Sequence, residues 1–154
     1  MTFETRLREL GLTLPETPVP VAKFVPAVRT GNLIYVSGQI PTVAGALAMT
    51  GKLGREISVE QGQEAARVAL LNALAAMRSV TGSLDAVRRI VKLNGWVASA
   101  EGFTSQPQVV NGASELLEEI FGEAGKHARA AIGVAELPSG VPVELELIVE
   151  VQPE

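Results

Sequence analysis

Two long segments of the chain repeat their apolar residues with the period of an α-helix. The first begins at the capping-box pattern Ser58-Val-Glu-Gln61, in which the Ser58 hydroxyl can accept a hydrogen bond from the backbone N–H of Gln61 while the Gln61 side chain reaches back. Its apolar face is rich in alanine, which favours close packing on a sheet, and consists of Ala66, Ala69, Leu70, Ala73, Leu74 and Met77. The second begins near Ser105, with Gln108 as its capping partner, and carries Val110, Ala113, Leu117, Ile120 and Phe121 on one face.

Segments with the two-residue period of a β-strand lie before, between and after these predicted helices. An apolar run over 33–37 follows the turn signal Gly31-Asn32, and further strands are predicted over 86–98, 129–135 and 142–151. In the 86–98 strand the residues predicted to share one face are Val91, Leu93, Gly95 and Val97. In the last strand the predicted core residues are Val143, Leu145, Leu147, Val149 and Val151, opposite Glu144, Glu146, Ile148 and Glu150.

The order of these elements indicates an α+β fold in which the two main helices pack on one face of a sheet. The other face then needs a cover, and a neighbouring subunit would supply one. At 154 residues the chain is long enough to bury a sizeable core, and we expect a single domain over 1–154.

The N-terminal part precedes this unit and has its own pattern. Thr2 can cap a short helix, and the residues expected on its inner face are Phe3, Leu7 and Leu10. Four prolines between Thr13 and Pro26 predict an extended arm. Glycines and a proline spread over 41–55 predict a mobile loop.

Composition and charge remove several classes of function. The chain has no cysteine and one histidine, which excludes thiol nucleophiles, disulfides and multi-histidine metal sites within one chain and is typical of the cytoplasm. The net charge of −4, spread along the chain, argues against a nucleic-acid partner. No uncharged stretch is long enough to cross a membrane, and the N-terminus lacks the apolar run of a signal peptide.

Two charged residues remain as candidates for chemistry. Arg129 begins a strand of otherwise small and apolar residues, and its planar fork could hold a carboxylate through two charge-assisted hydrogen bonds. Glu144 lies early on the neighbouring strand, on its non-core face, where a carboxylate could orient a water or move a proton. Both residues also have a structural interpretation, as a surface arginine at a strand end and as a charge that blocks edge pairing. His127 is interpreted as a turn residue near a strand start.

Several blocks of the chain resemble, in order and spacing, blocks of the reactive-intermediate deaminase (Rid, YjgF-like) family. The blocks are Gly31-Asn32 with Ser37-Gly38-Gln39-Ile40-Pro41, Val110-Asn111, His127-Ala128-Arg129-Ala130 with Val134-Ala135-Glu136-Leu137-Pro138, and Val143-Glu144-Leu145-Glu146. The resemblance extends over roughly residues 20–151. It implies a chorismate-mutase-like fold, a homotrimer with sites in clefts between subunits, and no cofactor or metal; residues 1–18 would be an N-terminal extension.

The resemblance also implies a reaction and roles for single residues. The reaction is the hydrolysis of a 2-imino or enamine acid to a 2-keto acid and ammonia. Arg129 would bind the substrate carboxylate and Glu144 would lie near the hydrolytic water. The residues that would line the cleft are Phe24, Gly38, Asn111 and Ala131, the last through its backbone carbonyl.

Departures from the family pattern keep other functions open. Phe24 stands where the deaminases have tyrosine, Ala130 and Ala131 replace a Ser-Cys pair, and Gly133 replaces a glutamate. A protein of the same fold that binds a small carboxylate without turnover is therefore an alternative. An endoribonuclease, an older label of the family, is a third, and the acidic net charge and single histidine speak against it.

Overall fold

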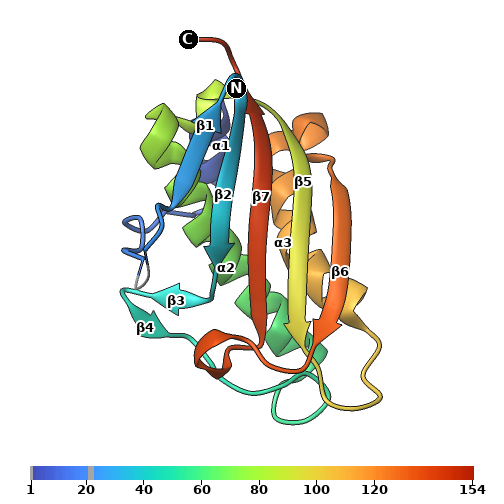
Figure 1. Ribbon diagram of the computed structural model, residues 1–154. Helices are drawn as coiled ribbons and strands as arrows, with labels where there is room; N and C mark the ends of the chain where they lie inside the picture. The colour runs from blue at the N-terminus through green and yellow to red at the C-terminus, as the bar shows by residue number, and fades with distance from the viewer. Residues whose placement is uncertain (1, 21–22) are drawn as a thin grey trace.

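A five-stranded sheet forms one layer of the molecule and the helices form the other (Figure 1). The computed structural model describes residues 2–20 and 23–154. The strands lie in the order β1-β2-β7-β5-β6 and span Ala27–Thr30 (β1), Leu33–Gln39 (β2), Val143–Val151 (β7), Val87–Ala98 (β5) and Ala128–Val134 (β6). The long helices α2 (Val59–Thr81) and α3 (Gln106–Phe121) lie on the same face of this sheet. The predicted α+β class, with helices on one face, is confirmed.

The last strand of the chain lies at the centre of the sheet. β7 pairs antiparallel with β2 on one side and with β5 on the other, while β5 pairs parallel with β6 at the edge. The expectation that Arg129 and Glu144 lie on adjacent strands is therefore wrong, because β5 separates β6 from β7. A parallel pair needs a crossover, which α3 supplies between β5 and β6, so β6 is placed beside β5 and not beside β7.

Strict alternation in β7 divides the sheet into two faces. Its five apolar core residues are buried as predicted, and Glu144, Glu146 and Glu150 are half-buried on the opposite side. In β5 the predicted face is right for Leu93, Gly95 and Val97 but wrong for Val91. A register shift between Ile90 and Lys92 changes the alternation, so that Ile90 takes the core position.

The two long helices begin in different ways. Ser58 and Gln61 form the predicted capping box, with the Gln61 N–H donating to Ser58 Oγ at 3.1 Å. Ser105 makes no capping hydrogen bond, so the predicted Ser105–Gln108 capping pair is wrong, and Gln106 instead donates to the carbonyl of Phe103 at 2.8 Å. Both predicted apolar faces are buried against the sheet and against each other.

The short N-terminal helix α1 (Phe3–Glu9) is capped by Thr2 and packs on α3 and on a 3₁₀ turn, η1 (Leu84–Ala86). The rings of Phe3 and Phe121 meet edge to face at 4.9 Å, and Leu7 is buried. Leu10 caps the helix and is exposed, contrary to its predicted place on the inner face. Of the predicted extended arm, residues 21–22 lie outside the described part, and no helix or strand is assigned in the described residues of 13–25.

Glu4 on α1 joins the N-terminal segment to the rest of the fold. Its carboxylate accepts from Arg78 Nη1 at 2.9 Å and from the backbone N–H of Leu84 at 2.7 Å, and all three groups are partly buried. We expect Glu4→Ala to lower the free energy of unfolding by about 1–2 kcal/mol, because two charge-assisted hydrogen bonds are lost at a partly solvated site. Urea denaturation measures this change. Glu9→Ala on the same helix is the control, since Glu9 is exposed, and an equal loss in both variants would contradict the role of Glu4.

Residues 41–57 are more structured than the sequence predicts. They contain a small hairpin of β3 (Thr42–Val43) and β4 (Ala46–Leu47), and Leu53 is fully buried and bridges to Ser99. The buried amide of Asn72 on α2 donates to the carbonyls of Ile40 and Thr42, both at 3.1 Å. The predicted loop is therefore built into the core at both ends.

The sheet face opposite the helices has no helix over it in the described ranges (Figure 1). We call it the open face; strand register and alternation place on it Val28, Tyr35, Lys92, Asn94, Trp96, Ala130, Ile132, Glu144, Glu146 and Ile148. Val28, Tyr35 and Ile132 are each about half exposed.

No described helix has the length and apolar character needed to span a bilayer. Among the described residues the other 3₁₀ turns are η2 (Gly122–Gly125) and η3 (Pro138–Gly140).

Candidate functional site

Arg129 lies on the helix side of the sheet edge, where α3 holds it. Its register partner is Leu93, a core residue, and so its side chain leaves β6 toward α3. Arg129 Nη1 donates to Asn111 Oδ1 at 2.7 Å and to Ser114 Oγ at 3.1 Å. Asn111 and Ser114 are three residues apart on α3 and therefore share a face of that helix. The predicted pair of Arg129 and Asn111 is thus in contact.

The arginine fork keeps donors for a ligand. A guanidinium has five N–H groups, and among residues 2–20 and 23–154 only those of Nη1 have hydrogen-bond partners in the structure. The side chain forms no ion pair with any described carboxylate. Nε and Nη2 therefore remain for a carboxylate, which a guanidinium binds with two parallel hydrogen bonds.

His127 contacts the same group of residues through Ser114. Its Nε2 lies 2.9 Å from Ser114 Oγ and its Nδ1 lies 2.6 Å from the carbonyl oxygen of Gly125. A carbonyl only accepts, so Nδ1 carries the proton, and in the neutral ring Nε2 accepts from the Ser114 hydroxyl. His127 directly precedes β6, as predicted for a residue near a strand start, whereas Ser114 and its contacts with His127 and Arg129 were not predicted from the sequence. The signal was the spacing of Asn111 and Ser114, three residues apart on one helix.

Glu144 lies on the other face, next to Gly38. A Cβ atom added to Gly38 would come within 2.5 Å of Glu144 Oε2, so a side chain at position 38 would displace the carboxylate. Burial of the Glu144 side chain raises its pKa above the ordinary value, and the negative charge of Glu146 two residues on raises it further. The structure thus brings together the predicted residues Glu144 and Gly38.

The last two predicted cleft residues are Phe24 and Ala131, and they lie near different members of the predicted site. Phe24 is half exposed and precedes Val25, whose carbonyl accepts from Ser37 Oγ at 2.6 Å, which ties this part of the arm to the strand that carries Gly38. Ala131 lies two residues after Arg129 on the same face of β6 and packs against the core. Phe24 therefore lies close to the strand that carries Gly38, and Ala131 lies close to Arg129.

The predicted site residues fall into two groups, which we call half-sites, and one chain does not join them. Arg129, Asn111 and Ala131 lie on the helix side of the edge strand, whereas Glu144 and Gly38 lie on the open face two strands away. Glu144 pairs across β5 with Trp96 and, beyond it, with Ile132, not with Arg129.

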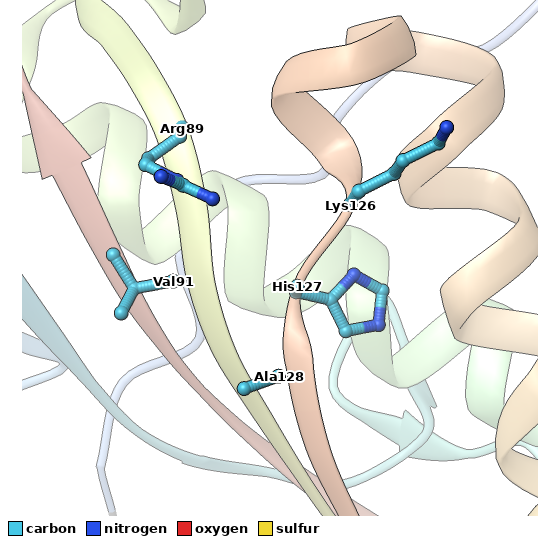
Figure 2. A pocket seen from close by; sticks show the side chains of 5 residues that line it. All are labelled: Arg89, Val91, Lys126, His127 and Ala128. Carbon is cyan, nitrogen blue, oxygen red and sulfur yellow. The ribbon is translucent and has the colours of Figure 1, made fainter.

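A notch of about 400 Å³ opens where β5 and the segment leading into β6 diverge. Figure 2 shows Arg89 on the β5 side of this notch and Lys126 and His127 on the other. Lys126 is paired with Glu123 at 2.8 Å, and the ring nitrogens of His127 are both hydrogen-bonded. In the described part of the chain no three carboxylate or imidazole groups come close enough to hold a metal ion.

Comparison with known proteins defines the class of this two-layer α+β chain. The family model described as "YjgF/chorismate_mutase-like, putative endoribonuclease" matches residues 4–147, and the chain belongs to this family. The protein TCP17 of Trypanosoma cruzi is 45% identical, over 94% of this chain and 91% of its own length. The crystal structure of Atu1372 from Agrobacterium tumefaciens superposes with a TM-score of 0.88 at 46% identity, over 97% of this chain and 92% of that one.

A more distant relative has an activity in its name. The 2-iminobutanoate/2-iminopropanoate deaminase of Dermatophagoides farinae is 28% identical, over 92% of this chain and 95% of its own length. Membership of the YjgF-like family, which the sequence blocks predicted, is therefore confirmed.

Proposed function

We propose that the protein hydrolyses 2-imino acids, or their enamine tautomers, to 2-keto acids and ammonia. The observation that supports this most is the half-buried Arg129, whose Nη1 is tied to α3 while its other N–H groups remain for a carboxylate. A related protein named as a 2-iminobutanoate/2-iminopropanoate deaminase supports the choice of reaction. Release of ammonia from 2-iminopropanoate, measured with the purified protein, tests the proposal.

In the proposed reaction the protein supplies position and charge, since the imine carbon is already electrophilic. Arg129 holds the carboxylate of the substrate, and the carbonyl of Ala131 accepts from the imino nitrogen. Glu144 takes a proton from water as the oxygen adds to the C=N carbon and gives it to the nitrogen, which forms a carbinolamine. Glu144 then takes the proton of the new hydroxyl and gives it to the nitrogen as the C–N bond breaks. Ammonia leaves and a ketone remains. Positioning of this kind accounts for large accelerations without a cofactor.

We propose that the complete site forms between copies of the chain in a homotrimer. Arg129 and Glu144 lie in different half-sites, so each site would take Arg129, Asn111 and Ala131 from one copy and Glu144 with Gly38 and Phe24 from the next. The open face supports this assembly, because it leaves Val28, Tyr35 and Ile132 half exposed around partly buried carboxylates. We also propose that the protein is cytoplasmic. Its chain would form a single domain, with residues 1–18 as an N-terminal extension.

Glu144→Gln removes the charge of this carboxyl and so tests two things separately: its role in the reaction and its effect on the stability of the protein. We expect turnover of 2-iminopropanoate to fall about a hundredfold, as for the loss of a proton-transfer group. The stability of the variant, in contrast to its turnover, should increase. A carboxyl whose pKa is raised by folding stabilises the protein below its unfolded pKa, and that contribution is lost as the pH rises through the folded pKa. At neutral pH the variant should therefore melt at a higher temperature.

The control is Glu150→Gln, because Glu150 lies on the same face of β7 but away from Gly38. Its turnover should equal that of the unmodified protein. Unchanged turnover in Glu144→Gln would remove Glu144 from the mechanism, and a lower melting temperature at neutral pH would contradict the electrostatic argument.

Binding of a small carboxylate without turnover is the second candidate. Phe24 favours it, because the resemblance places a tyrosine there in the deaminases and the hydroxyl that could contact substrate is absent. Calorimetry that detects binding of 2-keto acids, together with no ammonia release over a panel of imino acids, would select this function over the first.

A further inference from the structure

The hydrogen bonds behind Arg129 form a continuous chain that ends at the buried Gly125, where η2 packs closely against α3. Arg129 Nη1 donates to Ser114 Oγ, the Ser114 hydroxyl donates to His127 Nε2, and His127 Nδ1 donates to the carbonyl of Gly125. Each direction follows from the next partner, because the carbonyl at the end can only accept. The oxygen lone pairs of Ser114 are thereby directed to Arg129.

Gly125, whose carbonyl ends this series of hydrogen bonds, is held in place by packing. Gly125 is buried, and a Cβ atom added to it would overlap the carbonyl oxygen of Leu117 and come within 3.1 Å of the Glu118 Cα. The backbone of η2 therefore touches the backbone of α3. The same helix, α3, carries Ser114, so the acceptor for His127 Nδ1 and the partner of Nε2 belong to one rigid unit.

We propose that Ser114 and His127 are positioning residues for Arg129. An arginine side chain has several rotatable bonds, and one contact to Asn111 would leave its plane free to turn. The second contact, to a hydroxyl whose own orientation is set by His127, fixes Nη1 from two directions. It leaves Nε and Nη2 together as the ligand-binding edge.

This inference rests on the proposed function for its effect on ligand binding, but the hydrogen-bond chain can be measured without a ligand. His127 is the only histidine, so the ring nitrogens of a ¹⁵N-labelled sample give one set of signals. At a pH where the ring is neutral we expect Nδ1 protonated and Nε2 as the bare acceptor. Protonation at Nε2 instead would overturn the proposal, since Ser114 could then not donate to it.

Three variants test the effect on binding, with pyruvate as the carboxylate probe and calorimetry as the measurement. We expect Ser114→Ala and His127→Phe each to raise the dissociation constant of pyruvate about tenfold, as for the loss of a hydrogen bond that orients a charged group. His127→Gln should stay within about threefold of the unmodified protein, because its amide oxygen can accept from Ser114. Ser79→Ala, on α2, is the control and should change nothing.

The outcomes separate this inference from the proposed function. If pyruvate binds the unmodified protein and both Ser114→Ala and His127→Phe bind it equally well, the positioning role is wrong while the carboxylate site stands. Equal losses in His127→Phe and His127→Gln would also overturn it, since the rescue depends on the acceptor. If pyruvate fails to bind at all, the proposed function falls, and the ring-nitrogen spectrum still decides whether His127 orients Ser114.

Discussion

Arg129→Ala should reduce turnover of 2-iminopropanoate at least a thousandfold. The substitution removes the two charge-assisted hydrogen bonds proposed for the substrate carboxylate, each worth about 1.5–3 kcal/mol. A loss of about 4 kcal/mol in transition-state binding corresponds to roughly a thousandfold in rate. If Arg129 binds the substrate equally strongly in the ground state and the transition state, its removal raises KM alone, so kcat and KM are to be measured separately.

Two controls make this result specific. Arg88→Ala removes an exposed arginine from β5 and should leave both constants unchanged. Sedimentation of Arg129→Ala should give the same assembly as the unmodified protein, since the guanidinium contacts only Asn111 and Ser114 of its own chain among the described residues. Turnover that survives in Arg129→Ala, with assembly intact, would exclude the carboxylate role.

Gly112→Ala should have the largest effect on stability. Gly112 is the point where α3 crosses α2, and a Cβ atom there would overlap the carbonyl oxygen of Gln63 and lie 2.8 Å from its Cα. Alanine favours a helix by up to about 1 kcal/mol over glycine, but a backbone overlap in a packed layer costs more. We expect a net loss of about 3 kcal/mol and a melting temperature lower by about 10 °C, measured by circular dichroism.

Glu115→Ala is the matched control for this change. Glu115 is exposed on the same helix, so the substitution adds an alanine to α3 without adding an atom to the contact with α2. Its stability should stay within about 0.5 kcal/mol. A Gly112→Ala protein as stable as this control would mean that α2 and α3 can separate at little cost.

Local patterns predicted the elements that depend on neighbours in sequence. The capping box at Ser58 and the alternation of β7 are decided within a few residues, and the structure has both. The strand order is decided by distant pairings, and here the prediction was wrong: β7 lies between β2 and β5, two strands from Arg129's edge. The same reason explains Val91, whose face depends on a register shift against β7.

The candidate site was predictable in part for similar reasons. Arg129 and Asn111 could be selected from sequence blocks, but their contact requires the crossover that lays α3 beside β6. Ser114 lies outside the family blocks and His127 at the start of one, but the contacts of His127 with Ser114 and Gly125 follow only from distances of 2.9 and 2.6 Å around one imidazole. Residues 41–57 have the composition of a loop, and the buried Asn72 that holds them lies far away in the sequence.

The central place of β7 in the sheet also constrains the order in which the strands can pair during synthesis. During synthesis β2 and β5 leave the ribosome first, but they do not pair with each other in the sheet, because the gap between them belongs to residues 143–151. Until those residues emerge, both strands expose unpaired edges that are prone to misassembly. The crossover of β5, α3 and β6 can form early, whereas closure of the sheet waits for residues 143–151. Nascent chains stalled before β7 should therefore depend on chaperones.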